Sequence, residues 1–204
     1  MVYSEIMLPD NAPLEFKDRE TLWNVAEAKE KRCDARLARE IEVALQIEFD
    51  LQENKELLRA YIQENFVSKG MIADFAVHDK KRYKSANSEP HHADNPHCHI
   101  MLTTRHVTPD GFKGKNRDWD EDTELIQWRK NWADINNRMF EQKGLSERIN
   151  HRTLEAQGID REPTVHMGHE ATALERKGIA TVGATSTAQS KNVMRNTKRR
   201  KRKI

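Results

Sequence analysis

Long apolar runs are missing from this sequence of 204 residues, and cysteine is nearly so. No apolar stretch approaches the roughly 20 residues that a membrane-spanning helix needs. Residues 1–13 contain acids and prolines where a secretory signal would have a long apolar segment. The two cysteines, Cys33 and Cys98, form no CxxC pair, so we expect two free thiols in a reducing cytoplasm.

Charge of both signs is plentiful, at 33% of the residues, but it is unevenly distributed. Residues 185–204 hold eight basic residues and no acid, so the other 184 residues carry a net charge of −6 within a chain of net charge +2. We predict one domain at 1–179 and a disordered basic tail at 180–204. Tail residues such as Lys198, Arg199 and Arg200 would add salt-sensitive affinity for nucleic acid.

Two alternating stretches carry three histidines toward one face of a predicted sheet. Residues 95–105 read as a strand that begins after Asn-Pro, with His97 and His99 on one face and an apolar opposite face. Residues 71–78 alternate in the same way and end at His78. If these strands pair, three imidazoles converge and leave open positions, an arrangement that suits a divalent cation. The alternative is a His-x-His pair that merely decorates an exposed strand.

The remaining periodicities predict an α/β (α+β) fold. A strand at 39–49 alternates strictly, a further strand is expected at 2–8, and helices are expected at 18–31, 51–69 and 122–143. The apolar faces of the three inner strands agree with one another. We therefore predict a two-layer sandwich, a mainly antiparallel sheet with helices on one face and an open, polar, metal-bearing opposite face.

Several stretches together resemble the MobA/MobL plasmid-mobilisation relaxases, which belong to the histidine-hydrophobe-histidine endonuclease superfamily. The resemblance spans about residues 2–179. It is carried by "SEIMLPDNAP" (4–13), "DRETLWNVAE" (18–27), "AREIEVAL" (38–45), "ENFVSKGMIAD" (64–74), "ADFAVHD" (73–79), "NPHCHIMLTTR" (95–105), "NHRTLEAQGIDREPTVHMG" (150–168) and "ALERKGI" (173–179).

The resemblance implies a function in conjugative DNA transfer. Relaxases of this kind use a divalent metal ion, such as Mg²⁺ or Mn²⁺, to help a tyrosine cut one strand of DNA at a plasmid transfer origin. The expected partners are that single-stranded DNA and accessory relaxosome proteins. His78, His97 and His99 would be the metal ligands, and the product would be a phosphotyrosine bond.

Other polar residues are candidates for supporting roles. Glu40, Glu42 or Asp74 could accept the second ring N–H of a ligand histidine, and we expect Glu42 first. Arg105 could clamp a phosphate or form a salt bridge to one of these acids. The loop at 107–120 looks like a hairpin or flap. Its Lys113, Lys115 and Arg117 either line the DNA path or are simply solvated, and His91 and His92 are expected to be solvated loop residues.

The nucleophile is the point of departure from the family. The family's tyrosine lies on a segment upstream of "SEIMLP", and no such segment precedes these residues, so we expect an N-terminally incomplete domain. The tyrosines present are Tyr3, Tyr61 and Tyr83, of which Tyr3 is a weak candidate for a substitute. Two alternatives stay open: a metal-dependent phosphodiester hydrolase that uses activated water, and a non-catalytic DNA-binding module.

Overall fold

A computed structural model describes residues 1–78, 96–161, 163, 168, 170, 173–174 and 177–179. The chain divides into two compact units, Met1–His151 and Arg152–Ile204. The domain boundary expected at residue 179 stays a prediction. The predicted tail at 180–204 lies outside the described residues, as do Tyr83, His91 and His92. None of the described helices is long and apolar enough to span a membrane.

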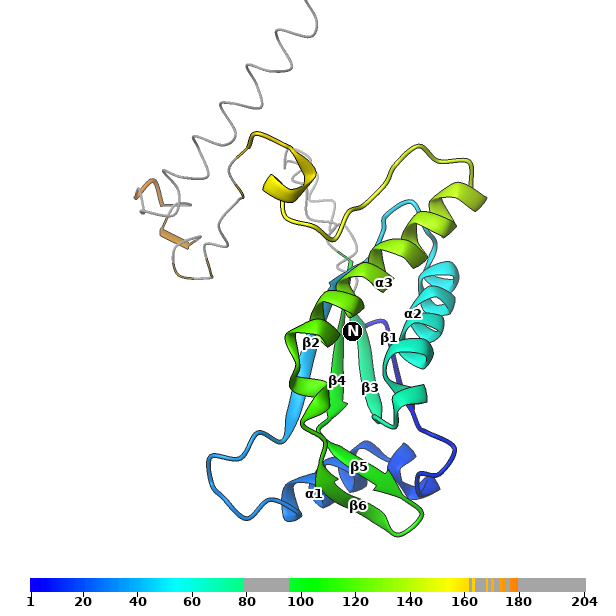
Figure 1. Ribbon diagram of the computed structural model, residues 1–204, viewed down its shortest axis with the longest axis vertical. Coiled ribbons are helices and arrows are strands. Elements are labelled where there is room, and N and C mark those ends of the chain that lie inside the picture. The colour runs from blue at the N-terminus through cyan, green and yellow to red at the C-terminus, as the bar shows by residue number, and fades with distance from the viewer. Residues whose placement is uncertain are drawn as a thin grey trace, which may run out of the picture. The chain divides into compact units, whose positions relative to one another are not determined.

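The first unit is built on a four-stranded antiparallel sheet, which confirms the predicted fold class (Figure 1). The strand order is β1 (Tyr3–Met7), β3 (Ala73–His78), β4 (His97–Thr103), β2 (Ala38–Ala44). The central strand β4 pairs with β3 on one side and with β2 on the other. Because side chains alternate along each strand, this register places all odd-numbered positions of β3 on the helix-covered face and all even-numbered ones opposite.

Two helices cover the apolar face of the sheet, α2 (Leu51–Asn65) and α3 (Asp122–Gln142) (Figure 1). Phe75, Ile100 and Leu102 from the strands pack in one buried cluster with Leu58 of α2 and Trp128 of α3. A capping box begins α2, since the side chains of Asp50 and Glu53 each accept a hydrogen bond from the other residue's backbone N–H. Trp128 of α3 is thus a core residue, and Trp132 is partly buried against the same cluster.

The first helix, α1 (Arg19–Ala28), packs elsewhere than predicted. It joins the 3₁₀ turn η1 (Leu14–Lys17) and the hairpin β5 (Arg105–Thr108) and β6 (Gly111–Lys115) in a second small core at one end of the sheet (Figure 1). That core holds Phe16, Leu22, Ile72, Val107 and Phe112. The hairpin itself was expected. Its apolar residues provide α1 with a separate surface, so α1 does not share the layer of α2 and α3.

The strand predicted at 39–49 ends early, at Ala44. The chain then turns, and the Asn54 side chain donates to the carbonyl oxygens of Gln46 and Phe49 at 3.1 Å each. The turn leaves Ile47 69% exposed and directs Phe49 against Phe140 of α3. Three short 3₁₀ turns complete the described elements, η2 (Val67–Lys69), η3 (Asp118–Asp120) and η4 (Glu155–Gln157).

Candidate metal centre

Three histidines meet on the face of the sheet opposite α2 and α3. His78 ends β3 and lies directly opposite His97 of β4, while His99 lies one step further along β4 on the same face. Each offers a ring nitrogen, and these three nitrogens lie within 4.8 Å of one another. The ring centroids are 5.0 to 5.3 Å apart, and all three side chains are half-buried. The structure thus brings together the three predicted ligands.

The donor set fits a divalent cation. A histidine nitrogen binds a metal such as Zn²⁺ at about 2.0–2.1 Å, so two ligands of one ion are at most about 4.2 Å apart. The three nitrogens, all within 4.8 Å of one another, are close to that spacing. Three neutral imidazoles are suitable ligands for several divalent ions and leave coordination positions free for substrate oxygens.

A carboxylate holds one of the three rings. Nδ1 of His99 lies 2.7 Å from Oε1 of Glu40 on the neighbouring strand β2. An ionised carboxylate can only accept, so Nδ1–H donates and the lone pair of His99 resides on Nε2. Glu42, the acid we expect first from the sequence, is directly opposite His99 in the register. Among the described contacts the diagonal neighbour Glu40 makes the bond, since a long side chain reaches across one register step.

The third acid considered, Asp74, is engaged elsewhere. It lies on the face of the sheet that carries the histidines, but it is only 6% exposed because α1 covers it. Its two oxygens accept from Arg19 at 2.8 and 2.7 Å and from the Trp23 indole at 2.9 Å. The hydrogen bonds to Asp74 raise the pKa of Arg19. Asp74 therefore anchors α1 to the sheet, and sequence periodicity could not have identified Arg19 and Trp23 as its partners.

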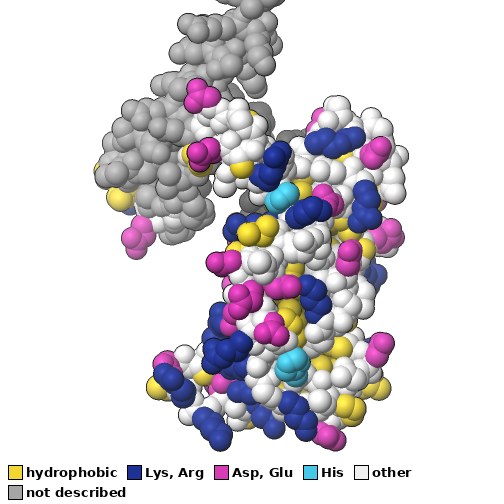
Figure 2. All heavy atoms as spheres, viewed as in Figure 1, with side chains coloured by type: hydrophobic (Ala, Val, Ile, Leu, Met, Phe, Trp, Pro, Cys, Tyr) yellow, Lys and Arg dark blue, Asp and Glu magenta, His cyan; other side chains and the backbone are white. Residues whose placement is uncertain are grey.

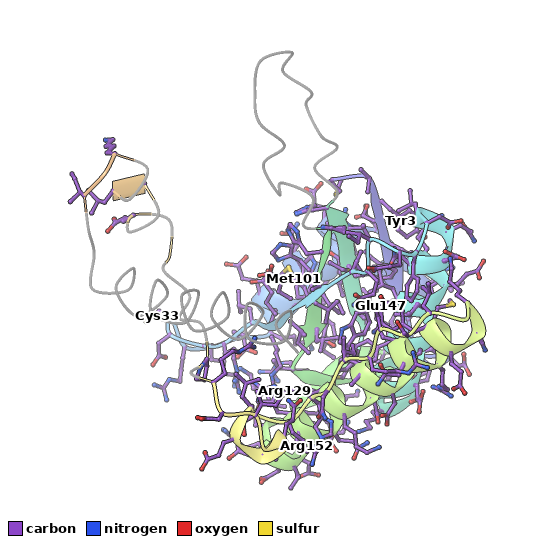
Figure 3. The ribbon with its side chains drawn as sticks, turned by 90° about the horizontal axis from the view of Figure 1, so that it is seen from above. Tyr3, Cys33, Met101, Arg129, Glu147 and Arg152 are labelled. Atoms are coloured by element: carbon purple, nitrogen blue, oxygen red, sulfur yellow. The ribbon has the colours of Figure 1, made fainter. Side chains whose placement is uncertain are left out.

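Neither of the two tyrosines within the described residues lies near the histidines. Tyr3 pairs with Val77, on the helix-covered face, and lies beside α2 (Figure 3). Its hydroxyl donates to Glu5 at 2.6 Å and accepts from Arg59 at 2.7 Å, and burial is the main cause of its raised pKa. Tyr61 is in the core and donates to the Trp128 carbonyl, with its pKa raised by burial. The geometry argues against Tyr3 as a nucleophile at this centre.

The predicted DNA-contacting cations lie beyond the end of β4, away from the three histidines. Arg105 begins β5, and its guanidinium donates to Glu30 at 2.9 Å and to the Lys113 carbonyl at 2.8 Å. Its acid partner is thus Glu30 and none of the acids considered from the sequence. Lys115 also pairs with Glu30, at 3.2 Å, whereas Lys113 pairs with Asp110 at 3.6 Å. Lys198, Arg199 and Arg200 are outside the described residues.

Comparison with known proteins agrees with the resemblance seen in the sequence. The chain matches the MobA/MobL family over residues 1–177. It is 33% identical to the conjugal transfer protein TraA of Agrobacterium fabrum, with 87% of this chain and 18% of that protein aligned. It is 32% identical to the mobilization protein MobL of Acidithiobacillus ferridurans, with 87% and 52% aligned.

A solved structure, from work on the molecular basis of vancomycin resistance transfer in Staphylococcus aureus, is also similar. The TM-score is 0.64 at 34% sequence identity, over 74% of this chain and 75% of the other. The chain spans only about a fifth of TraA and about half of MobL. Since the family match covers nearly the whole described structure, this chain belongs to the MobA/MobL family.

Proposed function

We propose that this protein is a plasmid-mobilisation relaxase that nicks single-stranded DNA at a transfer origin with the help of a divalent cation. The observation that carries the proposal is the convergence of His78, His97 and His99 on one sheet face, with their ring nitrogens within 4.8 Å. Membership of the MobA/MobL family and relatives named as conjugal transfer and mobilization proteins support it.

The residues of the centre suit an anionic substrate. Because all three candidate ligands are neutral imidazoles, a bound divalent cation would keep its full charge and could offset the charge that builds on a phosphate oxygen during cleavage. Glu40 fixes the ring and tautomer of His99, so that Nε2 remains available. Met101, on the same face of β4, is 38% exposed and gives a nucleic-acid strand an apolar surface beside the centre.

Hydrolysis by water is the second candidate function. It is favoured by the position of the described tyrosines, since Tyr3 is on the opposite face and Tyr61 is in the core. Hydrolysis at the same three histidines would need no tyrosine and would leave no protein–DNA bond. The relaxase reaction, in contrast, transfers the 5′ phosphate to a tyrosine and releases a free 3′ hydroxyl.

One experiment separates these reactions. The protein is incubated with Mn²⁺ and an end-labelled single-stranded transfer-origin oligonucleotide, and the products are separated under denaturing conditions. A covalent protein–DNA adduct supports the relaxase, whereas cleavage without an adduct supports the hydrolase. His97→Ala should abolish either product, because it removes one of the three ligands. Intact DNA with the unaltered protein, despite measurable binding, would overturn both and leave a DNA-binding module.

A further inference from the structure

A basic groove lies at the end of the sheet that carries the hairpin β5–β6. Its volume is about 560 Å³, and it lies between the segment after α1 and the start of β5. Lys and Arg side chains gather over this end of the molecule (Figure 2). Seven basic and three acidic residues line the groove: Lys29, Lys31, Arg32, Arg36, Arg105, Lys115 and Arg117, with Glu30, Asp34 and Asp120.

One carboxylate organises part of this groove. The Glu30 side chain is only 9% exposed and accepts from Arg105 at 2.9 Å and from Lys115 at 3.2 Å. Lys115 in turn donates to the Arg36 carbonyl at 2.7 Å. The hydrogen bond from Arg105 is the main reason why the pKa of Glu30 lies below its ordinary value. Glu30 therefore stays ionised and holds two cations from the hairpin in fixed positions.

Other cations in the groove remain available for a ligand. Within the described part of the chain, the side chains of Lys31 and Arg117 form no ion pair or hydrogen bond, and both line the groove. The groove as a whole has four more basic than acidic residues. This excess stands out because the first 184 residues carry a net charge of −6. Because the body as a whole is acidic, its net charge does not attract a polyanion. The local excess of positive charge in the groove would instead attract an extended polyanion at this place.

We propose that this groove binds backbone phosphates of the same DNA strand that meets the three histidines, and that it does so without a metal ion. The proposal rests on the proposed function, since it assumes that the substrate is DNA. The cations are spread along the groove and come from separate segments, which suits successive phosphates better than one small anion. Phosphate contacts of this kind fix the register of the nucleic acid without reading its bases.

The fold sets the distance between the two sites. Thr104 lines the groove and comes directly after the end of β4, five residues beyond His99. At about 3.3 Å per residue, that separation is about 17 Å. A stacked strand advances 3.4 Å per nucleotide, so about five nucleotides connect the two sites. We therefore expect affinity to rise stepwise once the DNA extends about five nucleotides beyond the position held at the histidines.

The test is DNA binding by the full chain in EDTA, measured by fluorescence anisotropy at several salt concentrations. The double variant Lys31→Ala, Arg117→Ala should bind a single-stranded oligonucleotide about tenfold more weakly, and its log–log salt slope should be smaller by about 1.4. The matched control is Arg129→Ala, Arg138→Ala, which removes the same charge from exposed positions on α3. The control should bind as the unaltered protein does.

Each outcome decides between the alternatives. Equal loss in both double variants would show that only net charge matters and would overturn the groove, as would an unchanged salt slope in the groove variant. Because the measurement needs neither a metal ion nor cleavage, its failure can be told apart from a failure of the nicking reaction. If binding depends on the groove but no covalent adduct forms in Mn²⁺, the relaxase activity is refuted and the groove is kept as a DNA-binding site. If an adduct forms and the groove variant binds DNA as well as the unaltered protein, the groove is refuted and the relaxase activity is kept.

Discussion

Glu40 and Glu42 stand two residues apart on the same face of β2, yet His99 is held by Glu40. We expect Glu40→Gln to weaken Mn²⁺ binding about tenfold, because losing a carboxylate partner lowers the basicity and order of a ligand histidine. The effect should be at the low end of the usual range, since the Glu40 side chain is 62% exposed. Isothermal titration calorimetry measures it.

Glu42→Gln is the matched control, because it removes the same charge from the same face. It should leave the affinity for Mn²⁺ within about twofold of the unaltered protein. If the two variants weakened binding equally, the loss would reflect the general field of the carboxylates, and the specific role of the Glu40–His99 bond would be rejected.

Asp74 should behave as a structural residue. We expect Asp74→Asn to cost about 1–2 kcal/mol, since it breaks a charged pair with Arg19 that is about half exposed on the arginine side. The melting temperature should fall by about 2–8 °C. Metal affinity should not change, because Asp74 bonds to α1 and not to a histidine. Reduced Mn²⁺ affinity in a folded Asp74→Asn protein would contradict this assignment.

Residue patterns predicted the three histidines because strand alternation fixes which side chains share a face. They named Glu40 and Glu42 as possible partners of a histidine but not which of the two makes the bond, and they did not identify Arg19 and Trp23 as the partners of Asp74. Both contacts depend on tertiary placement: one on the register of β2 against β4, the other on α1 crossing the histidine face. Alternation alone treats all acids on a face as equivalent.

At the scale of elements, the type of each helix and strand followed from periodicity, while the placement of α1 did not. The apolar stripe of an amphipathic helix shows that one face is buried, but it does not show which surface of the protein covers that face. The hairpin β5–β6 adds Val107 and Phe112 to a second core, and α1 packs there. The same hairpin takes Arg105 out of β4, which explains why this residue does not reach the histidines.

Glu30 links this hairpin to the segment after α1. The ionisation of Glu30 should therefore make the stability of the folded protein depend on pH. Its folded pKa is lowered, so its contribution is present above the unfolded value of about 4.5 and is lost as the pH falls through the folded pKa. Glu30→Gln should therefore destabilise the protein by about 1–3 kcal/mol at pH 7. The difference from the unaltered protein should shrink below pH 4.5.

Urea unfolding between pH 7 and pH 3 tests this, with Glu27→Gln on α1 as the control. Glu27 forms no side-chain bond within the described residues, so the control should track the unaltered protein. A stability difference for Glu30→Gln that stayed constant down to pH 3 would contradict a role for the ionised carboxylate and would point to lost packing.

For the molecule as a whole, charge is divided between an acidic body and a basic C-terminal segment. Residues 190–204 contain all eight basic residues of the last twenty and no acid. Each phosphate neutralised on single-stranded DNA adds about 0.7 to the magnitude of the salt slope. Deleting 190–204 should therefore weaken binding at low salt and reduce the slope by up to about 6. What remains should be the contribution of the basic groove and the metal centre.

Replacing 190–204 with a Gly/Ser segment of equal length controls for chain length, and it should behave like the deletion, because only the charge is lost. The basic segment and the folded body should contribute differently to DNA binding. The basic segment should set unspecific affinity for any DNA, whereas the histidines and the groove depend on geometry and should set where the strand lies. An unaltered salt slope after deletion would reject the segment as a DNA contact and assign all phosphate binding to the folded body.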